Sequence, residues 1–368
     1  MEQPIRRIAV NTGGGDAPGL NAVIRAIVLS ALQRGWQVLG IRKGYEGLLD
    51  TSKIIQLDRD SVRGITHLGG TIIGTTNKGH PFEYPMRMPN GETVLVDRSD
   101  EVVANVRRLK IDALITIGGD GSMRIASRLA EKGVPVVGVP KTIDNDLSGT
   151  VITFGFDTAV TVATEAIDRL HSTAEAHDRV FVVEVMGRYA GWIALNSGVS
   201  ATADVILIPE IPFSIERVCD KIMDREAHGR HFAIVVAAEG ARPVGGEMSV
   251  KGSELGREVL LGGIGEQVAR GISELTGKET RTVVLGHLQR GGGPTTFDRL
   301  IALRFGAAAV RFVEQRQFNV MVALDPPTVL AVPLSVATER MKSVPLDSDT
   351  ILTARDLGVS FGDSQDRP

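Results

Sequence analysis

The sequence predicts an α/β fold with largely parallel sheets, and three observations lead to that prediction. Segments with strand-like and helix-like patterns alternate for most of the length, as expected when helices connect parallel strands. The 368 residues are enough for two domains of ordinary size. Apolar residues make up 43% and charged residues 23% of the chain, which is typical of a globular protein.

The first half of the chain begins with a short apolar run at 8–10, which we predict as a strand. Apolar residues between positions 20 and 32 recur every three or four residues, so a helix is expected there, ending near Gly35. The other elements predicted in this half are a strand at 38–41, a polar surface excursion at 78–100, a helix at 102–109, and strands at 113–117 and 134–139.

A second block of alternating patterns begins near residue 155. Its predicted elements are a long helix at 157–176, strands at 180–185, 205–208 and 232–237, a polar loop at 240–252, a helix at 254–275, a strand at 282–285 and a helix at 297–315. The last dozen residues are polar, and we expect them to fray.

The composition argues against several classes of protein. A net charge of −3 provides no basic field for nucleic acid. No apolar run approaches the roughly 18 residues that a membrane span needs, and the polar residues 1–7 do not resemble a signal peptide. Cys219 is the only cysteine, so an intrachain disulfide is excluded. These features predict a soluble cytoplasmic protein.

Two glycine-rich turns indicate phosphate binding. The turn at 118–122 reads Gly-Gly-Asp-Gly-Ser and follows a predicted strand, where backbone N–H groups can approach a phosphate closely. Asp120 adds a hard oxygen ligand suited to Mg²⁺. The turn at 13–19 follows the first strand and opens the first helix, which is also a phosphate-binding position. The alternative for this second turn is a purely structural role.

The run at 140–146, Pro-Lys-Thr-Ile-Asp-Asn-Asp, supplies a candidate base at a neighbouring strand end. Asp144 and Asp146 would point the same way if the backbone is extended. A carboxylate beside a sugar hydroxyl and a phosphate can accept the hydroxyl proton. The alternative is a solvated Asp/Asn turn.

Four arginines near predicted strand ends are candidate phosphate clamps, because the planar guanidinium binds two oxygens at once. They are Arg179, Arg188, Arg281 and Arg290. Each of them, taken alone, is more often a surface or salt-bridge residue, and His287 alone is more often structural. A Walker A loop is absent from the sequence.

Five motifs together resemble the 6-phosphofructokinase family, in order from about residue 6 to 310. They are Gly-Gly-Asp-Ala-Pro-Gly-Leu-Asn-Ala at 14–22, Gly-Gly-Asp-Gly-Ser at 118–122, Lys-Thr-Ile-Asp-Asn-Asp at 141–146, Val-Glu-Val-Met-Gly-Arg at 183–188 and Leu-Gly-His-Leu-Gln-Arg-Gly-Gly at 285–292. The resemblance implies two doubly wound α/β lobes with the active site between them. It assigns residues 1–155 and 289–339 to a donor lobe, and 156–288 and 340–368 to a fructose 6-phosphate lobe.

The resemblance also implies a role for each motif residue. Asp144 is the base for the sugar 1-hydroxyl, supported by Thr142, Asp146 and Arg188. The implied donor site consists of Gly14, Gly119, Asp120, Gly121 and Ser122, with Asp120 binding Mg²⁺. The implied sugar phosphate site consists of Thr142, Ile143, Asp144, Arg179, Met186, Gly187, Arg188, Glu239, Arg281, His287, Leu288, Gln289 and Arg290. Arg179 and Arg281 match arginines that the family supplies from a neighbouring subunit, in a homo-oligomer that is usually a tetramer and otherwise a dimer.

The phosphoryl donor expected from the resemblance is ATP. Gly121 matches ATP-using members, because a glycine leaves room for the nucleotide. Lys141 matches members that use pyrophosphate, and Asn77 replaces an arginine that contacts the donor in simple bacterial members. For allosteric control, Arg25 and Arg59 match the bacterial effector site, whereas Leu29 replaces another of its arginines.

The leading hypothesis is therefore an ATP-dependent 6-phosphofructokinase of glycolysis. The first alternative uses pyrophosphate as donor. A second is a non-catalytic regulatory subunit, against which the presence of Asp120, Asp144 and Arg188 argues. A third, an NAD or lipid kinase, leaves the downstream arginines unexplained.

Overall fold

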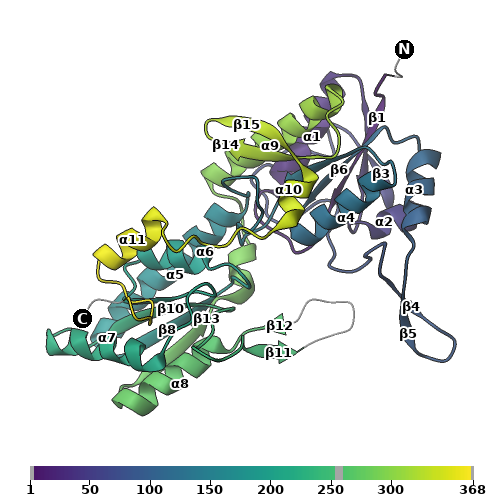
Figure 1. Cartoon of the computed structure of the whole chain (residues 1–368). Coiled ribbons are helices and arrows are strands. Elements are labelled where there is room, and N and C mark those ends of the chain that lie inside the picture. The colour runs from purple at the N-terminus through teal and green to yellow at the C-terminus, as the bar shows by residue number, and fades with distance from the viewer. Residues whose placement is uncertain (1–3, 253–259, 366–368) are drawn as a thin grey trace.

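The computed structural model describes residues 4–252 and 260–365. Within these residues the strands form a seven-stranded sheet, a four-stranded sheet and two separate two-stranded ribbons. The two larger sheets belong to two lobes that are joined at a narrower waist (Figure 1). The predicted α/β class with mainly parallel sheets is confirmed.

The seven-stranded sheet has the order β15-β14-β7-β6-β1-β2-β3. Its strands from β14 to β2 are parallel, and the outer strands β15 and β3 are antiparallel to their neighbours. The strand bounds are β1 Arg7–Thr12, β2 Gln37–Ile41, β3 Ile54–Leu57, β6 Ala113–Gly118, β7 Val136–Pro140, β14 Val320–Asp325 and β15 Thr328–Pro333.

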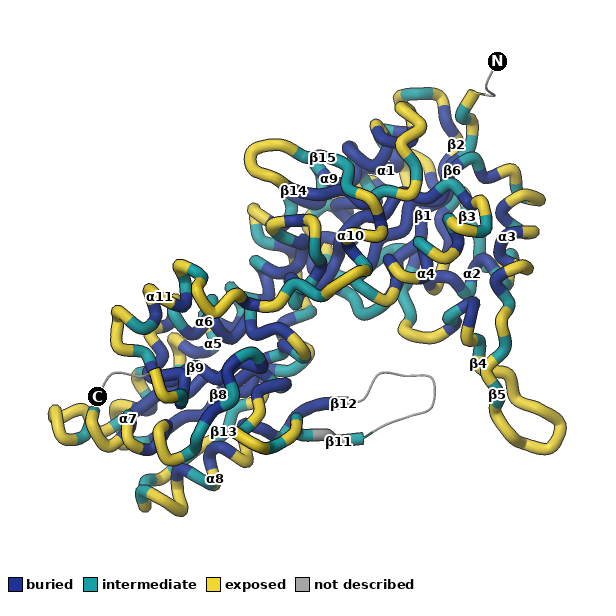
Figure 2. The backbone as a smooth tube through the Cα atoms, viewed as in Figure 1, coloured by how far each residue is buried: buried dark blue, intermediate teal, exposed yellow. Residues whose placement is uncertain are grey.

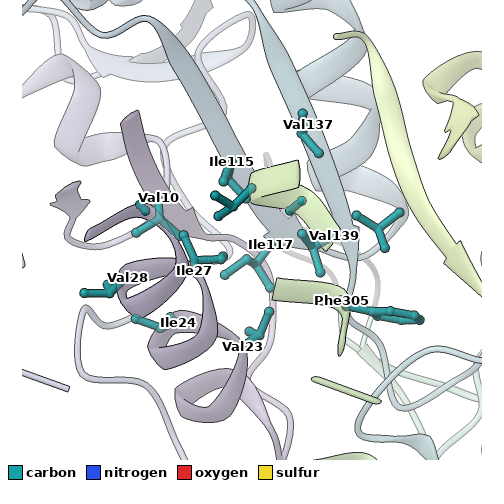
Figure 3. Close-up of a cluster of buried hydrophobic side chains, with 14 of the residues drawn as sticks. Val10, Val23, Ile24, Ile27, Val28, Ile115, Ile117, Val137, Val139 and Phe305 are labelled. Carbon is teal, nitrogen blue, oxygen red and sulfur yellow. The ribbon is translucent and has the colours of Figure 1, made fainter. Parts of the chain in front are cut away.

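Helices cover both faces of this sheet because successive strand residues point to opposite sides. Val10 packs in the cluster beneath α1 and α9, whereas its neighbour Ala9 packs in the cluster on the other face. Figure 3 shows the first cluster, in which side chains of β1, β6 and β7 meet those of α1 and Phe305 of α9. The helices of this lobe are α1 Leu20–Gln33, α2 Glu46–Leu49, η1 Thr51–Lys53, α3 Ser99–Arg108, α4 Asp120–Glu131, α9 Thr296–Glu314 and α10 Leu334–Glu339.

The four-stranded sheet has the order β13-β8-β10-β9 and is entirely parallel. Phe181 packs toward α5 and α6, and the adjacent Val182 packs toward α7 and α8, so this sheet is also covered on both faces. Central strands of both sheets, such as β6 and β8, are buried along their whole length, as the dark blue tube in Figure 2 shows. The elements of this lobe are β8 Val180–Val185, β9 Val205–Leu207, β10 Ala233–Ala238, β13 Thr280–Val284, α5 Phe156–Ala176, α6 Trp192–Ser200, α7 Ile215–Ala227, α8 Ile264–Thr276 and α11 Asp349–Asp356. The short helix η2 Gly286–Arg290 follows β13 and leads back toward the larger lobe.

Two ribbons extend from the lobes, and both correct the predictions. The surface excursion at 78–100 contains an antiparallel hairpin, β4 Tyr84–Arg87 and β5 Thr93–Val96, which projects from the larger lobe (Figure 1). The second ribbon pairs β11 Val250–Gly252 with β12 Leu260–Leu261. The predicted helix at 254–275 is therefore wrong at its start, since α8 begins only at Ile264; positions 254–259 lie outside the described residues.

The prediction of a frayed C-terminal dozen is wrong for its central part. Phe361 is fully buried, and Ser360 N donates to Asp204 O at 3.0 Å. Residues 366–368 lie outside the described range. The described tail thus extends the edge of the smaller sheet, where Ser360 forms a parallel bridge with Val205 of β9.

Candidate active site

Three polar loops meet at one edge of the larger sheet. Strands β1, β6 and β7 are parallel neighbours, so their carboxyl ends lie together. The turns at 13–19 and 118–122 and the loop at 141–146 follow these three ends directly. The expectation that the motifs lie on adjacent strand ends is met, and this edge is the usual ligand position in open α/β sheets.

The two glycine turns pack so closely that only glycine fits at their centre. Gly13 N donates to Ile117 O at 2.9 Å. A Cβ added at Gly118 would lie 2.3 Å from Ser122 Cβ, and one added at Gly13 would lie 2.4 Å from Ser122 Oγ. At Gly121, by contrast, an added Cβ meets nothing within 4 Å. The turn is therefore tightly packed at Gly118 and open to space at Gly121.

Asp120 is the first residue of α4 and forms an ion pair with Arg124, 2.9 Å away, one helical turn later. Among the described residues, no group of three or more histidine, cysteine or acidic side chains is arranged to hold a metal ion. Mg²⁺ commonly takes only one or two carboxylates and completes its shell with phosphate oxygens and water. Asp120 fits that use, since its partner Arg124 is more than half exposed and can move away.

The loop at 141–146 is not extended, which corrects the assumption behind the alternating carboxylates. Asn145 adopts a left-handed conformation with φ of 51° and so turns the chain between Asp144 and Asp146. Both carboxylates nevertheless face the same buried region. Asp144 Oδ1 and Asp146 Oδ1 are each buried and have no hydrogen-bond partner among the described residues.

Burial makes both carboxyl groups weaker acids than usual. It raises the pKa of Asp144, an effect that the positive charges of Arg290 and Arg188 oppose. Burial, together with the charge of Asp144, raises the pKa of Asp146 to about 7. A carboxylate with a raised pKa is a stronger base, which suits proton abstraction near neutral pH.

Two cations connect these loops from opposite directions. Lys141 Nζ donates to Gly15 O, and burial lowers the pKa of this ammonium to about 8, assisted by the positive charge of Arg290. Arg290 Nη1, at the end of η2 between the two lobes, donates to Asp16 O at 3.0 Å. Arg290 therefore connects the end of η2 to the glycine turn at 13–19.

The smaller sheet contributes Arg188 and Glu239 from the carboxyl ends of its central strands. Arg188 follows β8 and Glu239 follows β10, and Glu239 N donates to Val185 O at 2.8 Å. Gly240 N bonds Gly187 O, and an added Cβ at Gly240 would lie 1.8 Å from Arg188 O. Burial raises the pKa of Glu239, and the charge of Arg188 opposes that rise. Met186, Gly187, Arg188 and Glu239 are thus brought together as predicted from their strand positions.

Arg179 and Arg281 lie away from this group. Arg179 directly precedes β8 and Arg281 is the second residue of β13, so both lie at the amino edge of the smaller sheet. Glu279 forms ion pairs with both, and it is 2.9 Å from Arg179 Nε. Within one chain these two arginines face a different edge from Arg188.

The remaining predicted residues lie in η2, between the lobes. His287 and Leu288 are exposed, whereas Gln289 is buried and its Nε2 donates to Gly286 O at 3.2 Å. Arg290 ends this short helix.

Threonines near the first glycine turn were not predicted. Thr75 Oγ1 donates to Gly14 O at 2.6 Å, and Gly14 N donates to Thr76 O at 3.2 Å. These threonines stabilise the turn at 13–19 from a segment some 60 positions later in the chain. No sequence pattern connects residues that far apart. Asn77, noted for the donor question, is exposed beside them.

Comparison with known proteins adds independent information on this arrangement. A family model described as Phosphofructokinase matches residues 7–313. An ATP-dependent 6-phosphofructokinase of Chloroflexus aurantiacus is 54% identical over 99% of both chains. A pyrophosphate–fructose 6-phosphate 1-phosphotransferase of Streptomyces coelicolor is 49% identical over 97% of this chain and 100% of its own. The solved structure of Pichia pastoris phosphofructokinase in the T-state superposes with a TM-score of 0.79 at 30% identity, covering 100% of this chain and 38% of the Pichia chain.

Proposed function

Because the chain belongs to the phosphofructokinase family, we propose that the carboxyl edges of its two sheets together form one phosphoryl-transfer site. The protein is an ATP-dependent 6-phosphofructokinase, a phosphotransferase that acts on an alcohol group. It transfers the terminal phosphoryl group of ATP to the 1-hydroxyl of fructose 6-phosphate, giving fructose 1,6-bisphosphate. One observation carries the site assignment: the positive charges of Arg188, from the smaller lobe, and of Arg290, at the end of η2 between the lobes, act on the carboxyl group of Asp144 in the larger lobe.

In this proposal Asp144 accepts the proton of the sugar 1-hydroxyl as the phosphoryl group is transferred. Its raised pKa makes it an effective base, and its unpartnered Oδ1 leaves an acceptor for the hydroxyl. Thr142 positions the loop through its Oγ1, which accepts from Asp144 N at 3.1 Å. Asp146 lies close enough to the base for the negative charge of Asp144 to raise the pKa of Asp146.

The donor site is proposed to be the pair of glycine turns, including Gly14, Gly119, Gly121 and Ser122. Mg²⁺, when bound, would neutralise part of the phosphate charge, and Asp120 is the residue that would hold it. The sugar phosphate is proposed to lie against the smaller lobe. The residues assigned to it are Met186, Gly187, Arg188, Glu239, His287, Leu288, Gln289 and Arg290, with Thr142 and Ile143 from the larger lobe.

We assign residues 1–155 and 289–339 to the donor lobe and residues 156–288 and 340–368 to the sugar phosphate lobe. Arg179 and Arg281 are assigned to the site of a neighbouring subunit, in a tetramer or dimer. Their position at the amino edge of the smaller sheet supports this, since an outward-facing pair can contact the site of a second copy of the chain.

The buried thiol of Cys219 is consistent with a cytoplasmic location. Among the described residues, no helix combines the length and apolarity that crossing a membrane requires.

Pyrophosphate is the second candidate donor, and Lys141 is the observation that favours it. Its ammonium lies beside Gly14 and bonds Gly15 O, so it can compensate charge on a compact donor. Initial rates with fructose 6-phosphate and Mg²⁺ should be compared for ATP and pyrophosphate at equal concentration. Turnover with ATP supports ATP as the donor. Turnover with pyrophosphate and none with ATP would instead make pyrophosphate the donor.

A further inference from the structure

The chain passes from the larger lobe to the smaller one for the last time along residues 340–348, here called the crossing segment. It connects α10 to α11 and runs over the waist of the molecule (Figure 1). None of the sequence motifs includes it. Two of its residues nevertheless make hydrogen bonds that tie together loops of the active site.

Lys342 is the residue of the crossing segment with the most contacts to the loop at 141–153, here called the catalytic loop. Lys342 Nζ donates to Asn145 Oδ1 at 2.8 Å, to Val151 O at 2.9 Å and to Thr150 O at 3.0 Å. An ammonium group has three N–H donors, so all three are used within this one loop. The backbone adds a fourth bond, from Lys342 N to Asp146 O at 2.8 Å.

The position of these bonds bears directly on the two catalytic carboxylates. Asn145 lies between Asp144 and Asp146 in the left-handed conformation, which is uncommon for a residue with a side chain. Its Oδ1 accepts from Lys342 Nζ and also from Thr153 N at 3.1 Å. Two donors that hold this one oxygen fix the turn that aims both carboxylates.

The other side of the crossing segment binds the loop that presents Arg188. Trp192 Nε1, at the start of α6, donates to Lys342 O at 3.0 Å, and the Lys342 ammonium lies 5.6 Å from the centre of the Trp192 ring system. Two residues later, Val344 N donates to Glu210 Oε1 at 2.8 Å, and the same carboxylate accepts from Gly191 N at 3.1 Å. The segment therefore contacts the catalytic loop and the start of α6 at once.

We propose that Lys342 is a positioning residue for phosphoryl transfer, which holds the catalytic loop in register with the loop that carries Arg188. The proposal rests on the function given above, since it takes Asp144 as the base. Lys342 does not reach the reacting atoms itself. It acts through Asn145 on one side and through Trp192 on the other.

A lysine at this place is costly, which argues for a specific use. Burial lowers the pKa of the Lys342 ammonium to about 8, and only the charge of Asp146 opposes that effect. Its hydrogen-bond acceptors are neutral amide and carbonyl oxygens. An apolar side chain would avoid the desolvation cost but would leave three loop acceptors without this donor.

Lys342→Met, which keeps the length of the side chain but removes its donors, tests the proposal kinetically. We expect kcat to fall about 10–100-fold, because small displacements of catalytic groups are expensive. The KM for ATP should stay within about twofold, because the glycine turns do not contact Lys342. Lys342→Arg, which retains donors, should recover part of kcat.

Lys278→Met is the matched control. Lys278 is largely buried and pairs with Glu226 at 3.0 Å, at a place remote from the catalytic loop. A merely structural role for Lys342 predicts that both methionine variants lose thermal stability and keep their kcat. A kcat of Lys342→Met equal to that of Lys278→Met would overturn the proposal.

Amide hydrogen exchange of residues 142–153 provides a readout that does not need activity. Lys342→Met should accelerate exchange in this loop, and Lys278→Met should not. If the wild-type protein lacks phosphofructokinase activity but exchange at 142–153 is still faster in Lys342→Met, the proposed function is wrong, whereas the role of Lys342 in holding the catalytic loop is supported. Unchanged exchange in Lys342→Met refutes the positioning role whatever the activity.

Discussion

At the scale of single residues, the protonation of the carboxyl groups in the catalytic loop is controlled by burial and by neighbouring charges from both lobes. Asp144 is surrounded by the cations Lys141, Arg188 and Arg290, which favour its ionised form, while burial and Glu239 disfavour it. Burial is the largest of these effects, so the pKa of Asp144 is raised. The raised pKa makes the Asp144 carboxylate a better proton acceptor, and the cations around it favour the ionised form from which it would act.

Asp144→Asn preserves the shape of the side chain but cannot accept a proton. We expect kcat to fall about 10²–10⁴-fold, with a smaller change in the KM of fructose 6-phosphate. Steady-state kinetics with ATP and Mg²⁺ measures both. Turnover that matches the wild type would remove Asp144 from its role.

Asp146 links the same burial to the stability of the free enzyme. Its pKa is about 7 in the folded protein, above the ordinary value of 3.8, so the folded state holds this proton more tightly than the unfolded chain. Between about pH 4 and pH 7 the unfolded chain releases the proton first, and stability therefore falls as the pH rises. Asp146→Asn should remove that loss, and its Tm advantage over wild type should grow from about pH 5 to pH 8.

Calorimetry of the ligand-free proteins across this pH range tests the effect. Asp100→Asn is the control, since the Asp100 side chain is 93% exposed. A Tm difference between wild type and Asp146→Asn that stays constant with pH would contradict this prediction.

Donor choice is expected to depend more on Gly121 than on Lys141. Gly121 faces open space, so Gly121→Asp should fold normally but crowd and repel the nucleotide. We expect it to lose most ATP-dependent activity, and Lys141→Gly to lose less, because the ammonium only helps to neutralise either donor. Rates with both donors, together with melting curves of both variants, test this prediction. A larger loss of ATP-dependent activity in Lys141→Gly than in Gly121→Asp would contradict it.

At the scale of elements, the turn between β6 and α4 combines a closed and an open glycine within four residues. Gly118→Ala would push a methyl group to 2.3 Å from Ser122 Cβ, whereas Gly121→Ala meets no atom within 4 Å. We expect the first substitution to lower Tm and raise the KM for ATP severalfold, and the second to leave Tm nearly unchanged. Equal melting temperatures for the two variants would show that the turn tolerates the added carbon.

Elements with a strong period could be predicted from the sequence, and elements whose pattern depends on tertiary contacts could not. The strand at 180–185 matches β8 in both bounds, because a continuous apolar run is what a strand covered on both faces requires. Helix α6 was missed, since it is buried and rich in small and polar residues and shows little amphipathic contrast. Strands β14 and β15 were missed because they form a sheet edge that only pairing with β7 and with each other defines.

The same distinction holds for the site. The glycine turns and Asp144 could be identified because their residues are adjacent in sequence and follow strands. Lys342 could not, since it acts from nearly 200 positions beyond Asn145. An Asp/Asn turn at 144–146 was the alternative that the sequence left open, and the left-handed Asn145 forms such a turn, although it is buried and not solvated.

At the scale of the whole molecule, the proposed function assigns Arg179 and Arg281 to the site of a neighbouring subunit. A mixture of Arg281→Ala and Asp144→Asn proteins, each inactive alone, should regain activity once hybrid oligomers form. Each hybrid can then combine an intact Asp144 with an intact Arg281 from different chains. Activity should be measured after subunit exchange, with hybrids detected by mass. Hybrids without activity would mean that all residues of an active site come from one chain.

The sequence of strands in the larger sheet has a consequence for biosynthesis. β7 ends at Pro140, and its neighbour β14 begins only at Val320. The whole four-stranded sheet is translated between them. All four strands of the smaller sheet are therefore synthesised before β14 and β15 of the larger sheet. A translational arrest before residue 320 therefore leaves the glycine turns on a sheet that lacks β14 and β15.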